Sequence, residues 1–400
     1  MKILQISPQV PVPPTDGGKL SIWGNTVNLS KRGHKIDFVC YLKHSNYEES
    51  YKMLSNYCTP YLLKVKTDNS LWGAIINLFS RVPYNASKYK RKVLLKFIRN
   101  YFSKNEVDIV QVEHLHMGWI VDEIRKLSNA KIVLRQQNLE TLIMKRFYER
   151  QKNLFLKYFA KIQYKKFLKF EPYICSKFDK VIMISTADEA KLKKLNPSIN
   201  STTIPSGVNA NLLNVKRGKE IPFSLIHIGS MDWYPNFYGL QWFLEKVYPR
   251  VVEKFPESKL FIYGGGDTSK LKITDEIKQN INIVGFIDDL WEEISDKSLA
   301  IVPLKIGGGI RIKILEMLAA GQIILTTSIG SEGIELEDGK NALIANSAEE
   351  FNEKITEFFN NKFNLDEMRN EGKNLIRKNY TWDKIALRFE NEYKKLVKVL

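Results

Sequence analysis

Short apolar segments alternate with longer amphipathic segments along the whole chain, and no other feature restricts the fold as strongly. Strands separated by helices form parallel βαβ units, so the alternation predicts doubly wound α/β sheets. The expected strands of the first half are Lys2–Ser7, Lys35–Tyr41, Asp108–Val112, Lys131–Arg135, Lys180–Ser185 and Ser201–Ile204. Those of the second half are Ser224–Ile228, Lys259–Tyr263, Asn282–Val284, Leu299–Pro303 and Ile323–Thr326. The expected helices between the strands of the second half are Tyr238–Lys254, Leu290–Lys297 and Ile310–Ala320.

A turn-forming segment, Pro205-Ser206-Gly207, separates the two series of strands. We therefore expect two Rossmann-like domains that face each other across a cleft, an N-terminal domain of residues 1–205 and a C-terminal domain of residues 206–380. Residues 381–400 have the pattern of an amphipathic helix, which we expect to pack back on the N-terminal domain. Ligands of such sheets bind beyond the carboxyl ends of the strands, so a cleft of this kind suits two substrates.

The chain carries 61 Lys and Arg residues against 44 Asp and Glu residues, a net charge of +17. This charge favours anionic ligands such as nucleotides, phosphates, acidic lipids or nucleic acid. With 44% hydrophobic residues the chain can bury a large core, which excludes a disordered or fibrous protein. Three scattered cysteines favour neither a disulfide framework nor a zinc site, and no apolar run approaches the roughly 20 residues of a membrane span. We expect a cytoplasmic protein.

A strand, three glycines and a helix follow one another in the C-terminal half. The glycines, Gly307–Gly309, let backbone N–H groups approach an anion closely, because glycine has no Cβ. The helix that begins near Ile310 adds unpaired N–H donors and a partial positive charge. Arg311 and Lys313 bring two cations to the same place. The segment therefore predicts a diphosphate site.

Glu316 lies about two helical turns beyond the glycines, among apolar neighbours. A buried carboxylate is costly unless it is hydrogen-bonded, and a ribose diol offers two donors to one carboxylate. Glu316 is therefore a candidate for nucleotide binding. The alternative for the whole segment is a glycine turn that caps an ordinary helix, with Glu316 in a local ion pair.

Five segments resemble motifs of the GT-B glycosyltransferases of family 4, the glycosyl transferase group 1 enzymes. The longest is Gly229-Ser230-Met231-Asp232-Trp233-Tyr234-Pro235-Asn236, which is typical of sugar transferases of bacterial exopolysaccharide clusters. The others are Asp16-Gly17-Gly18, Val284-Gly285-Phe286-Ile287, the glycine loop through Glu316, and Tyr380-Thr381-Trp382. The resemblance covers nearly the full length of the chain and points to no particular sugar.

The resemblance implies a nucleotide sugar, UDP- or GDP-linked, as substrate, and no cofactor. The donor-binding residues that it implies are Gly17, Gly18, Ser230, Gly265, Phe286, Ile287, Gly307, Gly308, Gly309, Ile310 and Glu316. A plain strand-end turn is the alternative for Gly265 and Phe286. The chain departs from the family twice: Gly308 replaces the first Glu of the Glu-x7-Glu motif, and Met231 and Asn236 occupy the stretch where many members have an Arg and a Lys. We therefore expect Arg311 and Lys313 to bind the diphosphate in place of those residues.

The strand Asp108–Val112 resembles the family strand whose end carries an active-site histidine. In this alignment the histidine position falls on Glu113, His114 is adjacent, and His116 is two residues beyond His114, so any of the three is a candidate for contact with the sugar or the acceptor. On the acceptor side the expected residues are His116, Asn138 and Glu140. A purely structural role is the alternative for each of them.

Family 4 enzymes retain the anomeric configuration of the sugar. The resemblance implies front-face substitution, in which the departing diphosphate oxygen receives the acceptor proton and the protein stabilises charge on the leaving phosphate. The expected catalytic residues are Arg311, Lys313, Glu113 and His114. We expect Asp288-Asp289 to be a solvated loop and expect no metal, because enzymes of this fold are generally metal-independent.

Residues 142–178 carry ten Lys and Arg residues against two acidic residues, with aromatic residues interleaved. The pattern predicts a long amphipathic helix or a helix pair, which suits an anionic membrane surface. A lipid-linked acceptor would then be met at the inner face of the plasma membrane by a peripherally bound enzyme. The alternative is a solvated basic face whose aromatic residues pack on the core.

The function we expect is transfer of a sugar from a nucleotide-sugar donor to a glycan or lipid-linked saccharide, in polysaccharide or glycoconjugate synthesis. The alternatives are a nucleotide-sugar epimerase or hydrolase of the same fold, and a non-catalytic protein that binds anions or nucleic acid. Binding to nucleic acid is not expected, because the sequence has no helix-turn-helix, RNA-binding or zinc motif.

Overall fold

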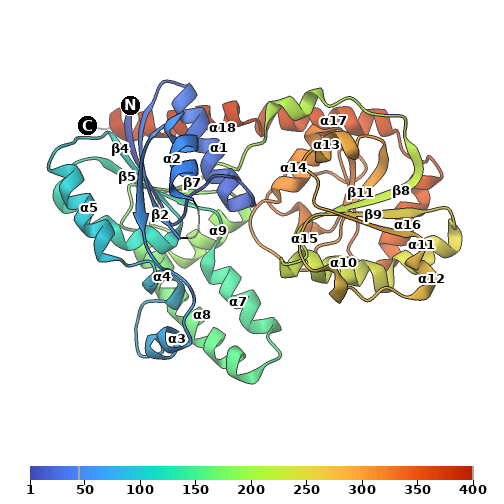
Figure 1. The fold of residues 1–400 in the computed structure, drawn as a ribbon, viewed down its shortest axis with the longest axis horizontal. Coiled ribbons are helices and arrows are strands. Elements are labelled where there is room, and N and C mark those ends of the chain that lie inside the picture. Colours follow the sequence, from blue (N-terminus) through green and yellow to red (C-terminus); the bar gives the residue numbers. More distant parts are fainter. Residues whose placement is uncertain (44–45, 399–400) are drawn as a thin grey trace. The chain divides into compact units, whose positions relative to one another are not determined.

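The computed structural model describes residues 1–43 and 46–398 and divides the chain into two compact units. The N-terminal unit consists of Met1–Ser206 together with the C-terminal residues from Trp382 onward, and the C-terminal unit consists of Gly207–Thr381. Each unit is a parallel sheet with helices packed on both faces (Figure 1). The expected α/β fold with two Rossmann-like units is confirmed.

In the described residues, the N-terminal unit has a seven-stranded parallel sheet in the order β3-β2-β1-β4-β5-β6-β7. Its strands are β1 (Lys2–Ser7), β2 (Lys35–Leu42), β3 (Thr59–Lys64), β4 (Ile109–Glu113), β5 (Lys131–Gln136), β6 (Lys180–Met183) and β7 (Ser201–Thr203). The strand order reverses at β1, where Ile3 pairs with Ile36 on one side and with Ile109 on the other. A crevice at such a switch point is the usual ligand position in these sheets.

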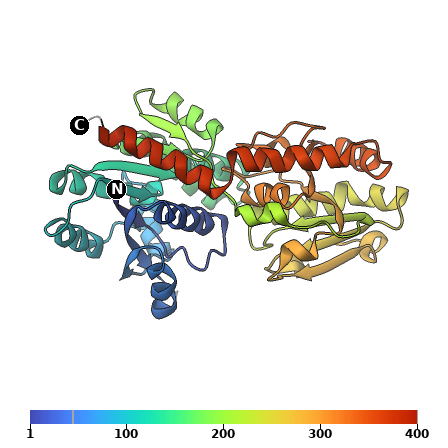
Figure 2. The ribbon, with the colours of Figure 1, turned by 90° about the horizontal axis from the view of Figure 1, so that it is seen from above.

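The helices of the N-terminal unit include one from the far end of the chain. They are α1 (Gly17–Lys31), α2 (Tyr47–Ser55), α3 (Leu71–Asn77), α4 (Tyr84–Ser87), α5 (Lys92–Phe102), the 3-10 helix η1 (Leu115–Ile120), α6 (Val121–Leu127), α7 (Glu140–Arg150), α8 (Leu154–Cys175), α9 (Thr186–Leu195) and α18 (Trp382–Lys398). Figure 2 shows α18 lying along this unit. It packs on α1, where a Cβ at Gly24 would overlap the Trp382 ring. Residues 399–400 of the expected helix lie outside the described residues.

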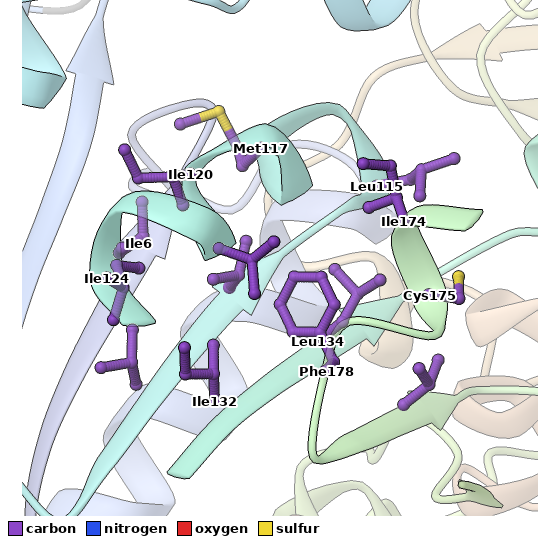
Figure 3. Packing of buried hydrophobic residues seen from close by; sticks show 14 of the residues in the cluster. Ile6, Leu115, Met117, Ile120, Ile124, Ile132, Leu134, Ile174, Cys175 and Phe178 are labelled. Carbon is purple, nitrogen blue, oxygen red and sulfur yellow. The ribbon is translucent and has the colours of Figure 1, made fainter. Parts of the chain in front are cut away.

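Apolar cores cover both faces of the N-terminal sheet. Figure 3 shows one of them, in which Leu134 of β5, Ile120 of η1 and Phe178 after α8 pack together. The core on the other face includes Phe38 of β2 and Phe389 of α18. Burial on both faces explains why these strands are nearly continuous apolar runs in the sequence.

The C-terminal unit has a six-stranded parallel sheet, counted within the described residues, in the order β10-β9-β8-β11-β12-β13. Its strands are β8 (Ile221–Ile228), β9 (Lys259–Tyr263), β10 (Ile281–Gly285), β11 (Lys297–Val302), β12 (Ile323–Thr326) and β13 (Leu343–Ile344). Its helices are η2 (Ala210–Asn214), α10 (Tyr234–Lys246), α11 (Tyr248–Lys254), η3 (Thr268–Lys270), α12 (Asp275–Lys278), α13 (Leu290–Glu293), α14 (Ile312–Ala319), α15 (Ser328–Ser331), α16 (Ala348–Phe359) and α17 (Leu365–Asn379).

The helix expected over Tyr238–Lys254 is two helices in the structure. Pro249 lies in the first turn of α11, and α10 ends just before it at Lys246. Proline has no N–H to continue the hydrogen-bond ladder of a preceding helix, so it begins a new one. The helix expected over Leu290–Lys297 is also shorter, because Lys297 belongs to β11.

Candidate functional site

The loops that follow β8, β9, β10 and β11 meet at the carboxyl edge of the C-terminal sheet. Backbone hydrogen bonds tie them together: the Met231 N–H donates to the Gly265 carbonyl at 2.8 Å, and the Gly264 N–H donates to the Gly285 carbonyl at 2.8 Å. Gly264 has φ +123°, and a Cβ there would overlap the carbonyl of Gly229. Only glycine therefore lets the loops after β8 and β9 approach so closely.

Helix α14 begins after the glycine loop and presents two charged side chains on one face. Six of its eight residues are buried, and the two that are not are Lys313 and Glu316. Residues three apart lie on the same face of a helix. Within the described part of the chain, no side chain caps the first turn of α14. The expected pairing of a helix N-terminus with a cation and a carboxylate is therefore present on a single element.

The Lys313 ammonium reaches from α14 to the end of β8. It donates to the Ile228 carbonyl at 2.7 Å and to Asn236 Oδ1 at 2.9 Å. Asn236 in turn donates to the Ser230 carbonyl at 3.1 Å. Burial, with the nearby Arg311 charge, lowers the pKa of Lys313 to about 7. Among the described residues no carboxylate pairs with Lys313, so its charge is available to an anion from outside the protein.

The Glu316 carboxyl has no hydrogen-bond or ion-pair partner in the part of the chain that the structure describes. Burial raises its pKa to about 7. The alternative considered from the sequence, in which Glu316 forms a local ion pair, is therefore not seen among the described residues. A half-buried carboxyl that lacks a partner is suited to accept hydrogen bonds from a ligand.

Arg311 takes a different position from the one expected. Its guanidinium folds back on the glycine loop, where it donates to the carbonyls of Gly308 and Gly309 and, at 3.3 Å, to that of Ile329. A Cβ on Gly307 would overlap this guanidinium. The glycines thus make room for Arg311 in this structure, and its role on the diphosphate stays a prediction.

The other expected donor residues of the C-terminal unit lie in the same set of loops. Ser230 is exposed after β8, and Gly265 has open space where a Cβ would stand. Phe286 is 77% exposed after β10. Ile287 borders an open hollow that is also lined by Asp289, Glu292 and Asp296. These acidic walls make the hollow unsuitable for a phosphate.

Glu113, expected as an active-site group, lies in the core of the N-terminal unit. Its side chain is fully buried, 3.5 Å from the equally buried Arg135 guanidinium. It accepts hydrogen bonds from Gln5, at 2.8 Å, and from Gln111. Tyr393 of α18 donates to the same Gln111. Because no part of the carboxylate is open to a ligand, a structural role replaces the expected catalytic one.

Three other expected residues gather at the carboxyl edge of the N-terminal sheet. His114 follows β4 with φ +65°, a backbone conformation that is costly for a residue with a side chain. His116 Nε2 lies 3.8 Å from Glu140 Oε2, and its ring lies 6.2 Å from that of His114. Burial lowers the pKa of His114 to about 3 and that of His116 to about 4, and it raises the pKa of Glu140 to about 7. Both imidazoles are therefore neutral at pH 7.

Gly17, Gly18 and Asn138 lie near this edge. Asp16 caps α1 by accepting from the Lys19 N–H at 2.9 Å, which places Gly17 and Gly18 in the first turn. The Gly18 carbonyl accepts from Gln137 at 3.1 Å. Asn138 follows β5 and is half-buried. Their roles toward a ligand stay predictions.

Comparisons with known proteins show which family and which solved structures this chain is similar to. Residues 222–361 match the family model described as glycosyl transferases group 1. A protein described as uncharacterized in the cps region of Klebsiella pneumoniae is 25% identical over 96% of this chain and 97% of its own length. Sucrose-phosphate synthase from Thermosynechococcus elongatus superposes with a TM-score of 0.71 at 15% identity over the full length of both chains. Anabaena HepE in complex with UDP has a TM-score of 0.68 at 11% identity over 99% of this chain and 100% of its own.

Residues 222–361 are thus similar to the group 1 glycosyltransferases, and the chain shares the fold of the solved structures. The matched residues, 222–361, contain the glycine loop, Lys313 and Glu316, so the family match and the candidate site coincide. None of the helices in residues 1–43 and 46–398 is long and apolar enough to cross a membrane. No three His, Cys, Asp or Glu side chains of those residues are placed to share a metal ion, and metal independence stays a prediction.

Sequence reasoning missed Glu171 and the contact that Asn236 makes with Lys313. Glu171 of α8 is fully buried and accepts from the Glu140 N–H at 3.0 Å and the Thr141 N–H at 2.7 Å, which fixes the start of α7. Burial raises its pKa to about 8. The sequence offered one indication of Glu171: it is an isolated acidic residue in a segment of apolar and basic residues. The sequence marked Asn236 only as a departure from the family's pattern, and its contact with Lys313 was not predictable locally because the two positions are 77 residues apart.

Proposed function

We propose that this protein is a retaining glycosyltransferase, which transfers a sugar from a UDP- or GDP-sugar to a saccharide or lipid-linked saccharide acceptor. The reaction needs no cofactor and no metal, and it serves polysaccharide or glycoconjugate synthesis. The observation that carries the proposal is the face of α14, where an ammonium and a carboxyl, both without a charged partner among the described residues, stand beside an uncapped helix N-terminus.

Two of the comparisons support the choice of substrates. Anabaena HepE, with which this chain shares its fold, has been solved with UDP and with UDP-glucose. The Klebsiella relative is encoded in a cps region. A nucleoside diphosphate as leaving group also fits the residues of α14, because a diphosphate requires positive potential and a ribose offers two hydroxyl donors.

The residues of the C-terminal unit take distinct parts in the proposed reaction. The Lys313 ammonium and the first N–H groups of α14 stabilise the charge that develops on the leaving diphosphate. Glu316 binds the ribose and thereby fixes the nucleotide along the helix. Asn236 holds the Lys313 side chain through its hydrogen bond of 2.9 Å. The diphosphate oxygen itself takes the proton of the acceptor hydroxyl, so no enzymic nucleophile is required.

The acceptor side of the proposal uses the carboxyl edge of the N-terminal sheet. His114, His116 and Glu140 stand together there, and neutral imidazoles at pH 7 serve as hydrogen-bond partners of sugar hydroxyls.

The proposed function is tested first with purified protein and a set of UDP-, GDP- and other nucleotide sugars. A donor that binds the native state raises the melting temperature, which selects the donor class. The anomeric proton of the product, followed by NMR from the start of the reaction, then gives the stereochemistry. Retention supports the proposal and inversion overturns it. Consumption of the donor without an acceptor identifies the epimerase or hydrolase alternative instead.

Replacing Glu316 with alanine is expected to weaken binding of the nucleoside diphosphate about 30-fold, since hydrogen bonds to a charged group contribute about 2 kcal/mol. Isothermal titration with UDP or GDP measures the change. Glu276→Ala, at an exposed position of α12, is the matched control and should bind like the wild type. Equal affinity of Glu316→Ala and the wild type would remove the ribose role.

Nucleotide binding is expected to take up about one proton at pH 8, because the pKa of Lys313 is lowered to about 7 in the free protein and rises when a diphosphate binds beside it. Lys313 is neutral above pH 7 in the free protein and must be protonated to pair with the anion, so affinity falls as the pH rises from 7 to 9. Calorimetry in buffers of different ionisation enthalpy counts the protons. Lys313→Met should take up none; uptake equal to that of the wild type would assign the proton to another group.

A further inference from the structure

Two segments of the N-terminal unit expose apolar side chains to an unusual degree. They are residues 71–91, which contain α3 and α4, and residues 142–178, which contain most of α7 and all of α8; together we name them the α3–α8 surface. In the first segment Phe79 is 92% exposed and Leu71 is 84% exposed, and in the second Phe155 is 88% exposed. These exposed fractions are much larger than those of aromatic and aliphatic side chains that pack on a core.

Polar contacts hold the two segments together. The buried Asn77 at the end of α3 accepts through Oδ1 from Gln163 at 3.0 Å and from Lys166 at 3.1 Å. The Tyr84 N–H of α4 donates to Gln163 at 2.9 Å. Figure 1 shows α3, α4, α7 and α8 together at the lower end of the N-terminal unit. The apolar residues of α3 thus stand on a fixed support and point away from it.

The apolar residues of the α3–α8 surface are gathered rather than scattered. Of the 24 large hydrophobic residues that are exposed in the described chain, 12 lie in these two segments. In the first segment they are Leu71, Trp72, Ile75, Ile76, Phe79 and Val82. In the second they are Phe147, Leu154, Phe155, Leu156, Tyr158 and Tyr173. A cluster of exposed apolar side chains of this size marks a surface that binds a membrane or another molecule.

The same two segments account for most of the net positive charge of the chain. The two segments, about one seventh of its length, contain 14 Lys and Arg residues and two acidic residues, Glu149 and Glu171. Their net charge of +12 compares with +17 for the whole chain. Lys161, Lys165 and Lys169 are exposed along α8. Lysine and arginine on such a surface extend to the charged headgroups while apolar side chains enter the acyl boundary.

We propose that the α3–α8 surface docks on an anionic lipid bilayer, with the side chains of α3 inserted among the headgroups and the α7–α8 lysines on the phosphates. An acidic protein or a nucleic acid would satisfy the charge, but it would leave the highly exposed Leu71 and Phe79 without apolar surroundings. The sequence predicted membrane binding for residues 142–178 only. The structure adds the exposed apolar residues of α3 to this surface. The proposal rests on this surface alone and not on the donor site.

The proposal is tested by flotation of the full-length protein with phosphatidylcholine vesicles, with and without 30 mol% phosphatidylglycerol. The wild type should float with the anionic vesicles only. Trp72→Ser/Phe79→Ser should lower the partition coefficient at least tenfold, because apolar area no longer enters the bilayer. Lys161→Glu/Lys165→Glu/Lys169→Glu should lower it at least about 100-fold, since each basic residue near an anionic surface contributes about a factor of five.

Matched controls separate the surface from general effects on hydrophobicity and charge. Tyr47→Ser/Tyr51→Ser removes exposed aromatic residues from α2, and Lys246→Glu/Lys254→Glu/Lys278→Glu reverses three exposed charges of the C-terminal unit. Both should float like the wild type, and all variants should keep the wild-type circular dichroism spectrum and melting temperature.

Three results would overturn the proposal. The first is a wild type that does not float with anionic vesicles, or surface variants that float as well as the wild type. The second is binding to an RNA or DNA oligonucleotide, without flotation, that the three lysine replacements abolish. The third is a wild-type dimer in sedimentation, again without flotation, that Trp72→Ser/Phe79→Ser converts to a monomer. Each leaves the assignment of the donor site untouched.

Discussion

Lys313→Ala is expected to lower kcat about 1,000-fold, a loss of about 4 kcal/mol of transition-state stabilisation. Negative charge on the diphosphate increases as the sugar departs, so a cation beside it acts more strongly in the transition state than in the ground state. Lys313 is suited to this part, because it is held by Ile228 and Asn236 and has no carboxylate partner among the described residues. Steady-state kinetics with the donor from the stabilisation screen measure the effect.

The two kinetic constants decide how Lys313 acts. We expect the KM for the donor to change far less than kcat. A raised KM with an unchanged kcat would mean that Lys313 only binds the donor, equally in the ground state and the transition state. Lys246→Ala, which removes an exposed cation at the end of α10, is the control and should leave both constants unchanged.

Arg135→Met is expected to lower the free energy of unfolding by about 3–5 kcal/mol, because it leaves the buried Glu113 carboxylate without its cationic partner. Arg135 also donates to the Ser21 carbonyl at 3.0 Å and lies 5.3 Å from the centre of the Phe389 ring, so it connects β5 with α1 and α18. Urea unfolding measures the loss. The double variant Glu113→Gln/Arg135→Met should regain much of it, since the isolated charge is then gone.

The exposed ion pair Arg99–Glu123 is the control for this experiment. Its N–O distance of 2.6 Å is shorter than that of the buried pair, but solvent screens it. Arg99→Met should therefore unfold at nearly the same urea concentration as the wild type. If Arg135→Met were as stable as the wild type but inactive, Glu113 and Arg135 would regain a functional role.

The sequence predicted the strands that lie in the middle of each sheet better than those at the edges. The strands β1, β4 and β5 are buried on both faces, and each contains at least three apolar residues, so they stand out. Edge strand β3 contains Pro60 and has exposed or half-buried positions, and β13 has only two residues; neither has the apolar run on which the prediction depends. Long-range pairing rather than local pattern makes them strands.

Within the candidate site, the sequence predicted elements well and side-chain contacts poorly. The strand, glycine loop and helix from β11 to α14 are where the pattern placed them. The orientation of Arg311 toward the carbonyls of Gly308 and Gly309 depends on loop geometry that residue types do not determine. Glu113 looked like a site residue because it ends a strand at the family's histidine position. Its burial comes from α18, whose Tyr393 joins the same hydrogen-bond network from the far end of the chain.

A crystal structure of the protein with UDP, or with the nucleotide that stabilises it most, tests the central claim most directly. The account predicts the diphosphate within hydrogen-bond distance of Lys313 Nζ and of the first N–H groups of α14, with the ribose hydroxyls on the Glu316 carboxylate. A nucleotide bound elsewhere, with Lys313 and Glu316 contacting no part of it, would contradict the account.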